Sequence, residues 1–328
     1  ENSIILYINE EPQKSTEELT TENKAIVSDL ETQINELKAK KNDEKDPDIV
    51  RLEEIKKQIE ENNSLIYTDW SCLGQGKSEL MLPNYLKESD NYELHNISCR
   101  NKIQDDTILL NARDEQAFID KITNVSPQYI VNCIGILING SDADPENAIF
   151  LNSYMPHRLA KLADTIDAKL IHISTDCVFS GDKKEPYTET DEKDGRGVYA
   201  KTKGLGEVIN DKHLTLRTSV VGPELKNDGE ELFHWFMNQS NSISGFTKAI
   251  WSGVTTVELA KAVKWSIDNN ITGLYHVTNN SSISKYDLLK LFQKYTKKDI
   301  NIKSFSGKDI DKSFIDTRLL MDYEIPSY

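Results

Sequence analysis

Two short segments carry the residue types best suited to catalysis. In IHISTDCVF, Ser174 and Thr175 end an apolar run, and in VYAKTKGLGE, Tyr199 and Lys203 stand four residues apart. Residues four apart on a helix project from one face. A neighbouring ammonium favours phenolate and lowers the pKa of a tyrosine from about 10. Such a tyrosine can pass a proton to a carbonyl oxygen while a hydride arrives, and the Thr175 hydroxyl can share the developing negative charge.

Short strands alternating with helices are expected to position these residues. Strands are predicted at 65–70, 92–98, 107–112, 129–135, 169–175 and 214–221, with helices between them such as 115–125 and 152–166. This alternation requires crossover connections and predicts a parallel sheet with helices on both faces, a doubly wound α/β domain. In such sheets ligands bind at the carboxyl ends of the strands.

The sequence divides into three regions. Residues 1–63 contain one strand-like run, SIILYIN, and two narrow apolar stripes separated by KKNDEKDPD, which predict an antiparallel helical hairpin. This hairpin is either a solvated appendage or a docking arm for another subunit or protein. Residues 64–222 form the predicted Rossmann-like domain. Residues 223–328 read as a smaller α+β lobe that binds substrate.

Composition limits the possible partners. The 328 residues carry a net charge of −15, which argues against a general nucleic-acid or anionic-membrane partner. No apolar stretch approaches the length of a membrane span, and the start lacks the features of a signal peptide. Cys72, Cys99, Cys133 and Cys177 have no paired spacing and are interpreted as small buried hydrophobes. A cytoplasmic protein is expected, and no metal site is predicted.

From residue 64 onward the chain resembles the extended short-chain dehydrogenase/reductases. Among them it is most similar to the dTDP-4-dehydrorhamnose reductases and related nucleotide-sugar reductases. The resemblance is carried, in order, by YIVNCIG, FLNSYMPHRLAKLA, HISTDCVFSGDKKEPYTETD, VYAKTKGLGE and LTLRTSVVGP. Two later segments, SGVTTVELAKAV and GLYHVTNNSSISKYDLLKLF, resemble the carboxyl-terminal lobe of that family.

The resemblance implies a reaction and a set of residues. NADPH would give a hydride to the C4 carbonyl of a nucleotide-linked 4-keto-6-deoxy sugar. Tyr199 would donate the proton, Lys203 would hold the nicotinamide ribose and lower the tyrosine pKa, and Thr175 would polarise the carbonyl. Asn132, Cys133, Ile134 and Ser174 would line the cofactor, and Asn152 would support the site; Asn132 and Asn152 are alternatively caps of a strand end and a helix. Candidate substrate contacts are Thr175, Asp176, Arg217, Trp251 and Arg318.

The phosphate-binding turn fits the pattern poorly. Counting back along the chain places it in SLIYTDWSCLGQGKS, where Thr68, Ser71 and Gly74 occupy the three glycine positions. Ser71, Leu73 and Gly74 are the expected cofactor contacts, through backbone donors at a helix start. The segment NISCRNK offers Arg100 and Lys102 and no carboxylate, which favours a 2′-phosphate and hence NADP unless both are solvated charges.

Two alternatives remain open for this turn. Gly76, Lys77 and Ser78 agree with a nucleoside-triphosphate loop, but Ser71 replaces its first glycine and Pro83 follows closely. A non-catalytic binding or regulatory subunit of the same family would also tolerate a degenerate turn. Because Thr175, Tyr199 and Lys203 are all present, the favoured hypothesis is an NADPH-dependent reductase in surface-polysaccharide precursor synthesis. The hairpin is the expected site of homo-oligomerisation or of binding to a protein partner.

Overall fold

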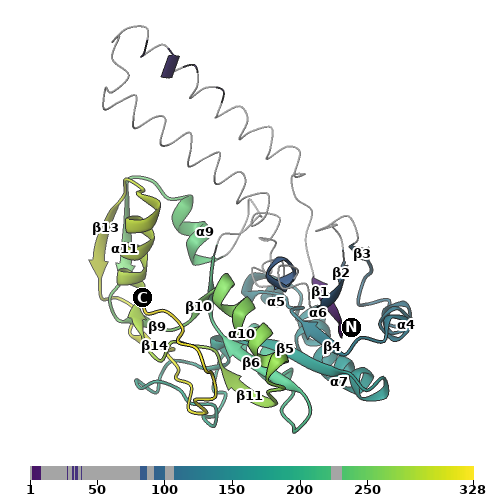
Figure 1. Ribbon diagram of the computed structural model, residues 1–328. Helices are drawn as coiled ribbons and strands as arrows, with labels where there is room; N and C mark the ends of the chain where they lie inside the picture. The colour runs from purple at the N-terminus through teal and green to yellow at the C-terminus, as the bar shows by residue number, and fades with distance from the viewer. Residues whose placement is uncertain are drawn as a thin grey trace.

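The computed structural model describes the backbone of residues 2–8, the stretches 82–86, 92–99, 107–222 and 231–328, and five single helical positions between 28 and 38. Within these residues the chain builds a seven-stranded parallel sheet of order β11-β6-β5-β4-β1-β2-β3 (Figure 1). Its strands are β1 (Asn2–Ile8), β2 (Tyr92–Ser98), β3 (Ile108–Leu109), β4 (Tyr129–Asn132), β5 (Lys169–Thr175), β6 (Leu214–Thr218) and β11 (Gly273–His276). The order reverses between β1 and β4, as in doubly wound nucleotide-binding folds. The predicted fold class is confirmed.

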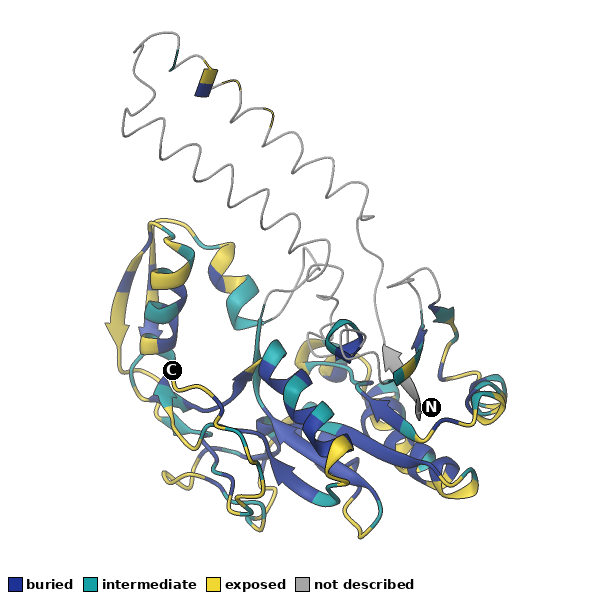
Figure 2. Cartoon of the chain, viewed as in Figure 1, coloured by how far each residue is buried: buried dark blue, intermediate teal, exposed yellow. Residues whose placement is uncertain are grey.

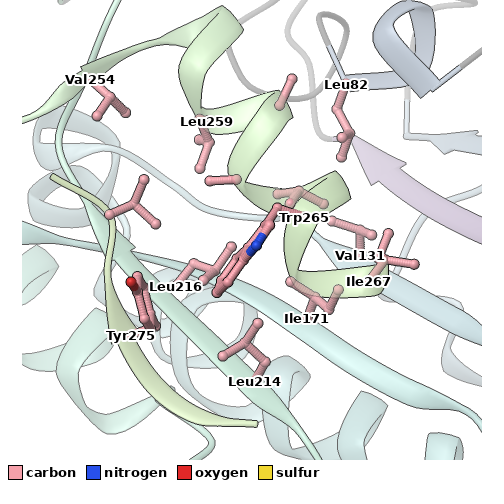
Figure 3. Packing of buried hydrophobic residues seen from close by; sticks show 14 of the residues in the cluster. Leu82, Val131, Ile171, Leu214, Leu216, Val254, Leu259, Trp265, Ile267 and Tyr275 are labelled. Carbon is pink, nitrogen blue, oxygen red and sulfur yellow. The ribbon is translucent and has the colours of Figure 1, made fainter. Parts of the chain in front are cut away.

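Helices cover both faces of the sheet. Adjacent strand residues point to opposite faces, so Ile130 and Val131 of β4 enter separate hydrophobic cores. One core is closed by α4 (Glu115–Val125) and α7 (Met155–Thr165), the other by α10 (Thr256–Asp268) (Figures 2 and 3). Buried on both faces, the strands form a rigid platform that fixes the positions of their carboxyl ends.

Several predicted elements match the structure residue for residue. The strands at 92–98 and 169–175 and the helix at 115–125 have the predicted bounds. The strand predicted at 107–112 is reduced to two paired residues, and the one at 214–221 is interrupted at Ser219, giving β6 and the short β7 (Val220–Val221). The shorter helical elements are α5 (Ile138–Ala143), α6 (Pro145–Ala148), the π-helix η1 (Ile149–Tyr154), the 3-10 turn η2 (Asp176–Val178) and α8 (Gly197–Leu205).

The assignment of the first strand is corrected by the structure. The sequence predicts that residues 65–70 supply it and that SIILYIN belongs to the appendage. In the structure, β1 pairs with β2 on one side and β4 on the other, so Asn2–Ile8 fills the central position. Residues 9–81 therefore separate β1 from the helical residues 82–86, where βα connections of about 2–6 residues are usual. Apart from the five helical positions between 28 and 38, the predicted hairpin and the strand at 65–70 lie outside the described residues.

A smaller lobe is built from the carboxyl-terminal third. It contains α9 (Leu232–Met237), α11 (Lys285–Thr296) and three short sheets, which pair β8 (Ser242–Phe246) with β13 (Asn301–Phe305), β10 (Val254–Thr255) with β7, and β9 (Ala249–Trp251) with both β12 (Ile283–Ser284) and β14 (Ile310–Asp311). Phe236, Leu288 and Phe292 form its separate core. The predicted limit at residue 222 is crossed twice, because α10 covers the large sheet and β11 extends it beside β6.

The central position of β1 gives a test by proline substitution. Proline lacks the N–H that a strand donates, so in an interior strand it removes a ladder hydrogen bond, and in sheets it is confined to edge strands, strand starts and bulges. Leu6 is registered with Asn96 and Val131 at once. We expect L6P to abolish cooperative urea unfolding, while L109P, in a strand whose one described neighbour is β2, shifts the midpoint modestly. Equal tolerance of both substitutions would contradict the placement of β1.

Candidate active site

The predicted catalytic residues meet at the carboxyl end of β5. Thr175 is the last residue of that strand, and Tyr199 and Lys203 lie on α8. The segment before α8 runs close against η2, since a Cβ on Gly195 would lie 2.5 Å from the Cys177 carbonyl oxygen. Only glycine permits this approach, which brings the start of α8 beside the strand end. The fold therefore assembles the three residues that the sequence singled out.

Hydrogen bonds connect the reactive hydroxyl groups. The Thr175 hydroxyl donates to Asp176 Oδ1 at 3.2 Å and accepts from the Cys177 backbone N–H at 3.2 Å. It also hydrogen-bonds the side chain of Tyr199. A threonine hydroxyl has one proton and two acceptor lone pairs. Because the interaction with Thr175 lowers the pKa of Tyr199, the hydroxyl acts towards the phenol as a donor, and its one proton serves either Asp176 or Tyr199.

The electrostatics of Tyr199 differ from the prediction. Lys203 was predicted to lower the tyrosine pKa, but burial raises the pKa of Tyr199 well above its ordinary value, and the carboxylates of Glu231 and Asp176 act in the same direction. Burial disfavours the charged phenolate. Tyr199 is thus a protonated donor in this structure. The Cys177 thiol beside it is protonated too, because burial raises its pKa to about 12.

Lys203 and Asn152 fix the floor of the site. Lys203 is buried and its Nζ donates to the carbonyl of Ile173 at 2.8 Å. Asn152 grips the loop after β4 at both polar groups of Ile136, accepting from its N–H at 2.8 Å and donating to its carbonyl at 3.1 Å. A Cβ on Gly135, in that loop, would stand 3.5 Å from Asn152 Oδ1 and 3.8 Å from Lys203 Nζ. The loop after β4 and the lysine therefore border the same space.

Asn152 lies in the π-helix η1, and Pro156 explains the irregular turn. Proline has no N–H to give the carbonyl four residues earlier, which here belongs to Asn152, and its ring clashes with that carbonyl. The helix widens locally as a result, a feature that often marks functional sites. The widened turn packs on Gly206 at the end of α8, where a Cβ would lie only 1.9 Å from the Asn152 carbonyl oxygen.

A buried ion pair lies directly behind the predicted catalytic residues. Glu207, just past α8, accepts two hydrogen bonds from Arg217 of β6, at 2.9 and 2.7 Å. Ser174 donates to the same carboxylate at 2.7 Å, and Arg217 Nη1 donates to His276 Nε2 at 2.8 Å. Burial and the Arg217 charge lower the pKa of His276 to about 4, so its ring is a neutral acceptor. The network joins β5, β6, β11 and the end of α8.

The predicted cofactor residues at the end of β4 face inward. Asn132 is fully buried, its amide donating to His172 Nδ1 at 3.0 Å and its Oδ1 accepting from the Ile134 N–H at 3.1 Å. The Ile134 side chain belongs to the core, whereas Cys133 is partly exposed. Ser174 uses its hydroxyl on Glu207. Cofactor contact at these positions is therefore predicted through backbone atoms.

The structure separates the predicted substrate residues. Arg217 is 1% exposed and engaged by Glu207 and His276, so it is a structural residue. Arg318 donates to the carbonyls of Thr272 and Leu274, at the amino end of β11 and thus at the wrong end of the sheet for the site. Trp251 and Asp176 do lie near Thr175, but both are buried, with exposed fractions of 3% and 6%.

Four predicted residues are not described, and two residues near the site were not predicted. Ser71, Leu73, Gly74 and Arg100 are outside the described residues and stay predictions. Glu207 and Glu231 were missed from the sequence. Glu207 follows Lys203 by four residues, the same spacing as Tyr199 to Lys203, and that continued helical stripe was the available signal. Glu231 gave none, since only the fold brings it near Tyr199.

Two searches of the described residues gave negative results. Among the positions that the structure describes, no three His, Cys, Asp or Glu side chains come together as ligands for a metal ion. Likewise, no helix in the described ranges has the length and apolar character needed to cross a bilayer.

A reversed strand order at β1 and β4, with Thr175, Tyr199 and Lys203 at the strand ends, defines the class as extended short-chain dehydrogenase/reductase. Residues 82–311 match the family model described as the RmlD substrate binding domain, and the chain belongs to this family.

The curated relatives that the chain matches include reductases and one subunit. The spore coat polysaccharide biosynthesis protein SpsK of Bacillus subtilis is 27% identical over 55% of this chain and 65% of its own length. The dTDP-4-dehydrorhamnose reductase of Escherichia coli is 27% identical over 52% of this chain and 61% of its own. Methionine adenosyltransferase 2 subunit beta of Xenopus laevis is 30% identical over 55% and 58%. The match thus spans less than two thirds of each relative.

Solved structures agree with the fold. A dTDP-4-dehydrorhamnose reductase from Clostridium acetobutylicum superposes with a TM-score of 0.61 at 25% identity, covering 70% of this chain and 80% of that one. One from Bacillus anthracis, solved in complex with NADP, gives 0.64 at 22% identity, covering 75% and 90%.

The contact between Gly206 and η1 gives a mutational test. G206A forces a methyl group into the Asn152 carbonyl, and such overpacking costs about 1–3 kcal/mol. We expect a lower urea midpoint and weaker function, because Asn152 is displaced. G204A is the matched control, since its Cβ would meet nothing nearer than 3.6 Å and alanine favours the helix by about 1 kcal/mol. A G206A protein as stable as G204A would disprove the tight contact.

The buried ion pair predicts a second stability effect. R217M leaves Glu207 with the partly exposed Lys193, 3.2 Å away, as its remaining counter-charge. It should cost about 3 kcal/mol at pH 7, the low end of the range for breaking a buried pair. R196M, which removes an exposed pair with Asp182, should cost under about 1 kcal/mol. Although burial alone would raise the pKa of Glu207, Arg217 lowers it overall from 4.5. The wild-type carboxylate therefore contributes stability that is lost as the pH falls through its lowered pKa. The wild-type advantage over R217M should be largest near neutral pH and shrink in acid, as measured by unfolding across pH.

Proposed function

We propose that this chain is an NADPH-dependent reductase of a nucleotide-linked 4-keto-6-deoxy sugar, acting in the cytoplasm on surface-polysaccharide precursors. The observation that carries the proposal is the placement of Thr175 at the carboxyl end of β5 beside Tyr199, with Lys203 on the same helix face and anchored on the Ile173 carbonyl of that strand. The E. coli and B. subtilis relatives, named for dTDP-4-dehydrorhamnose reduction and spore-coat polysaccharide synthesis, support the substrate class.

The described residues fit a dinucleotide. The switch point of the sheet lies between β1 and β4, where ligands bind beside the strand ends. The loop from Asn132 to Gly135 borders that point, and Gly135 leaves room beside Lys203 where a Cβ would otherwise stand. Lys203 would hold the nicotinamide ribose, and the backbone of Asn132–Ile134 would lie along the cofactor. Arg100 would favour the 2′-phosphate of NADP, and Ser71, Leu73 and Gly74 would meet the pyrophosphate.

Each catalytic residue has a defined task in this proposal. When bound, NADPH supplies the hydride that reduces the carbonyl carbon. Tyr199, kept protonated by burial, donates its phenolic proton to the carbonyl oxygen as charge develops there. Lys203, anchored on the Ile173 carbonyl, would direct its ammonium group towards the nicotinamide ribose. Thr175 holds the phenol in position and can turn its proton towards the new oxyanion.

Cofactor binding and turnover are tested separately. Wild-type protein should change NADPH fluorescence at micromolar concentration and oxidise NADPH with a nucleotide 4-keto sugar. Y199F should lose turnover by about 10²-fold or more, the usual contribution of a positioned proton donor, while binding NADPH unchanged. Y295F is the matched control, because Tyr295 is 75% exposed on α11 and should leave turnover intact. Folded protein that does not bind NADPH, or an active Y199F, would refute the proposal.

A non-catalytic regulatory subunit is the second candidate. It is favoured by the similarity to methionine adenosyltransferase 2 subunit beta and by the 9–81 segment that separates β1 from the first helix. A regulatory subunit would bind a partner protein and show no turnover with any nucleotide 4-keto sugar tested. The same fluorescence and turnover assays therefore decide between the two.

A further inference from the structure

A chain of hydrogen bonds leads from the smaller lobe to Tyr199. Trp251, on β9, donates its indole N–H to Ser219 Oγ at 2.7 Å. Ser219 in turn hydrogen-bonds the Asp176 carboxylate. Asp176 accepts the Thr175 hydroxyl at 3.2 Å, and Thr175 contacts the Tyr199 phenol. The Ser219 hydroxyl accepts one bond and donates the next, while the single proton of Thr175 is divided between Asp176 and Tyr199.

The packing around Ser219 shows that the chain is built closely. Ser219 sits at the break between β6 and β7, and its carbonyl accepts the Val254 N–H at 2.9 Å. Gly253 lies between Ser219 and the Trp251 ring, where a Cβ would come within 2.2 Å of the Ser219 carbonyl oxygen and 2.4 Å of the indole. No other residue type fits there, so the indole reaches the serine only because position 253 is glycine.

Charge from the smaller lobe also converges on Asp176. Burial raises the pKa of Asp176 overall, and Lys312, just after β14, and Lys285, at the start of α11, oppose that effect by favouring the carboxylate. From the large sheet, the neighbours of Asp176 are Thr175 and the protonated Cys177. Asp176 is therefore the point at which groups of both lobes meet, one residue from the catalytic threonine.

We propose that Asp176 is a positioning residue through which Trp251 and Ser219 of the lobe junction set the orientation of Thr175 towards Tyr199. The sequence predicted direct substrate contact for Asp176 and Trp251, and the proposal replaces that role with an indirect one. It rests on the proposed reductase function for its kinetic effect. The hydrogen-bonded arrangement itself does not depend on the identity of the substrate.

The kinetic test removes single hydrogen bonds from the chain. S219A and W251F should each lower kcat about tenfold with KM unchanged, since one positioning hydrogen bond is worth about that factor. Their effects should not add in the double variant, because both break the same chain. D176A should lower kcat further, and D176N, which keeps an acceptor oxygen for Thr175, should restore part of it. Raised KM with unchanged kcat in these variants would overturn the proposal in favour of direct substrate contact.

Trp265 offers a matched control for the indole substitution. It is a residue of α10 whose side chain packs in the core, as Figure 3 shows, and its indole N–H has no hydrogen-bond partner among the described residues. W265F makes the same chemical change as W251F without breaking the chain. We expect unchanged kcat in W265F, and an equal loss in both variants would show a general packing effect and contradict the proposal.

A readout without turnover separates this inference from the reductase function. Threonine labelled with 13C at Cγ2 reports the Thr175 methyl group, assigned by T175V. S219A and W251F should both move this resonance and W265F should not; S219A contains no aromatic change, so a ring current cannot explain its shift. An unmoved Thr175 resonance in S219A refutes the inference even in an active enzyme. Wild-type protein that reduces no sugar refutes the reductase function, while a moved resonance still supports the link.

Discussion

The pairing of Arg217 with Glu207 is the constraint on which the site depends. Two charges enclosed in the core are stable only when their hydrogen-bonding capacity is met, and here Ser174, His276 and the bidentate guanidinium meet it. Because Glu207 follows α8 and Arg217 belongs to β6, the pair fixes the end of α8 over the sheet. The position of Tyr199 and Lys203 above the end of β5 follows from that attachment.

The second constraint is the central place of β1. Sequence patterns identified SIILYIN as a strand but not its neighbours, since strand order depends on contacts between distant segments. Counting back from YELHNIS along the family's pattern placed the first strand at residues 65–70 instead. Only the pairing of Asn2–Ile8 with β2 and β4 corrects this. The strands β2 and β5 and the helix α4 were predictable because their periodicity and boundary residues are local.

The site divides in the same way. Thr175, Tyr199 and Lys203 could be singled out because their order and spacing agree with the family's motifs. A helix also places two residues four positions apart on one face. The protonation of Tyr199 could not be predicted, because it depends on burial and on Glu231 and Asp176, which the fold assembles. Arg217 was misassigned for a related reason. From sequence alone, an arginine after a strand looks equally suited to a phosphate or to a buried carboxylate.

The single proton of Thr175 links these points to mechanism. In this structure the hydroxyl donates that proton to Asp176, so it cannot at the same time polarise a substrate carbonyl. Polarisation requires the hydroxyl to turn away from Asp176, and the carboxylate then keeps its bond from Ser219 and the charges of Lys285 and Lys312. The groups around Asp176 thus offset the loss of its hydrogen bond from Thr175, and they come from the lobe junction. The smaller lobe would then act on the proton transfer as well as on the shape of the substrate site.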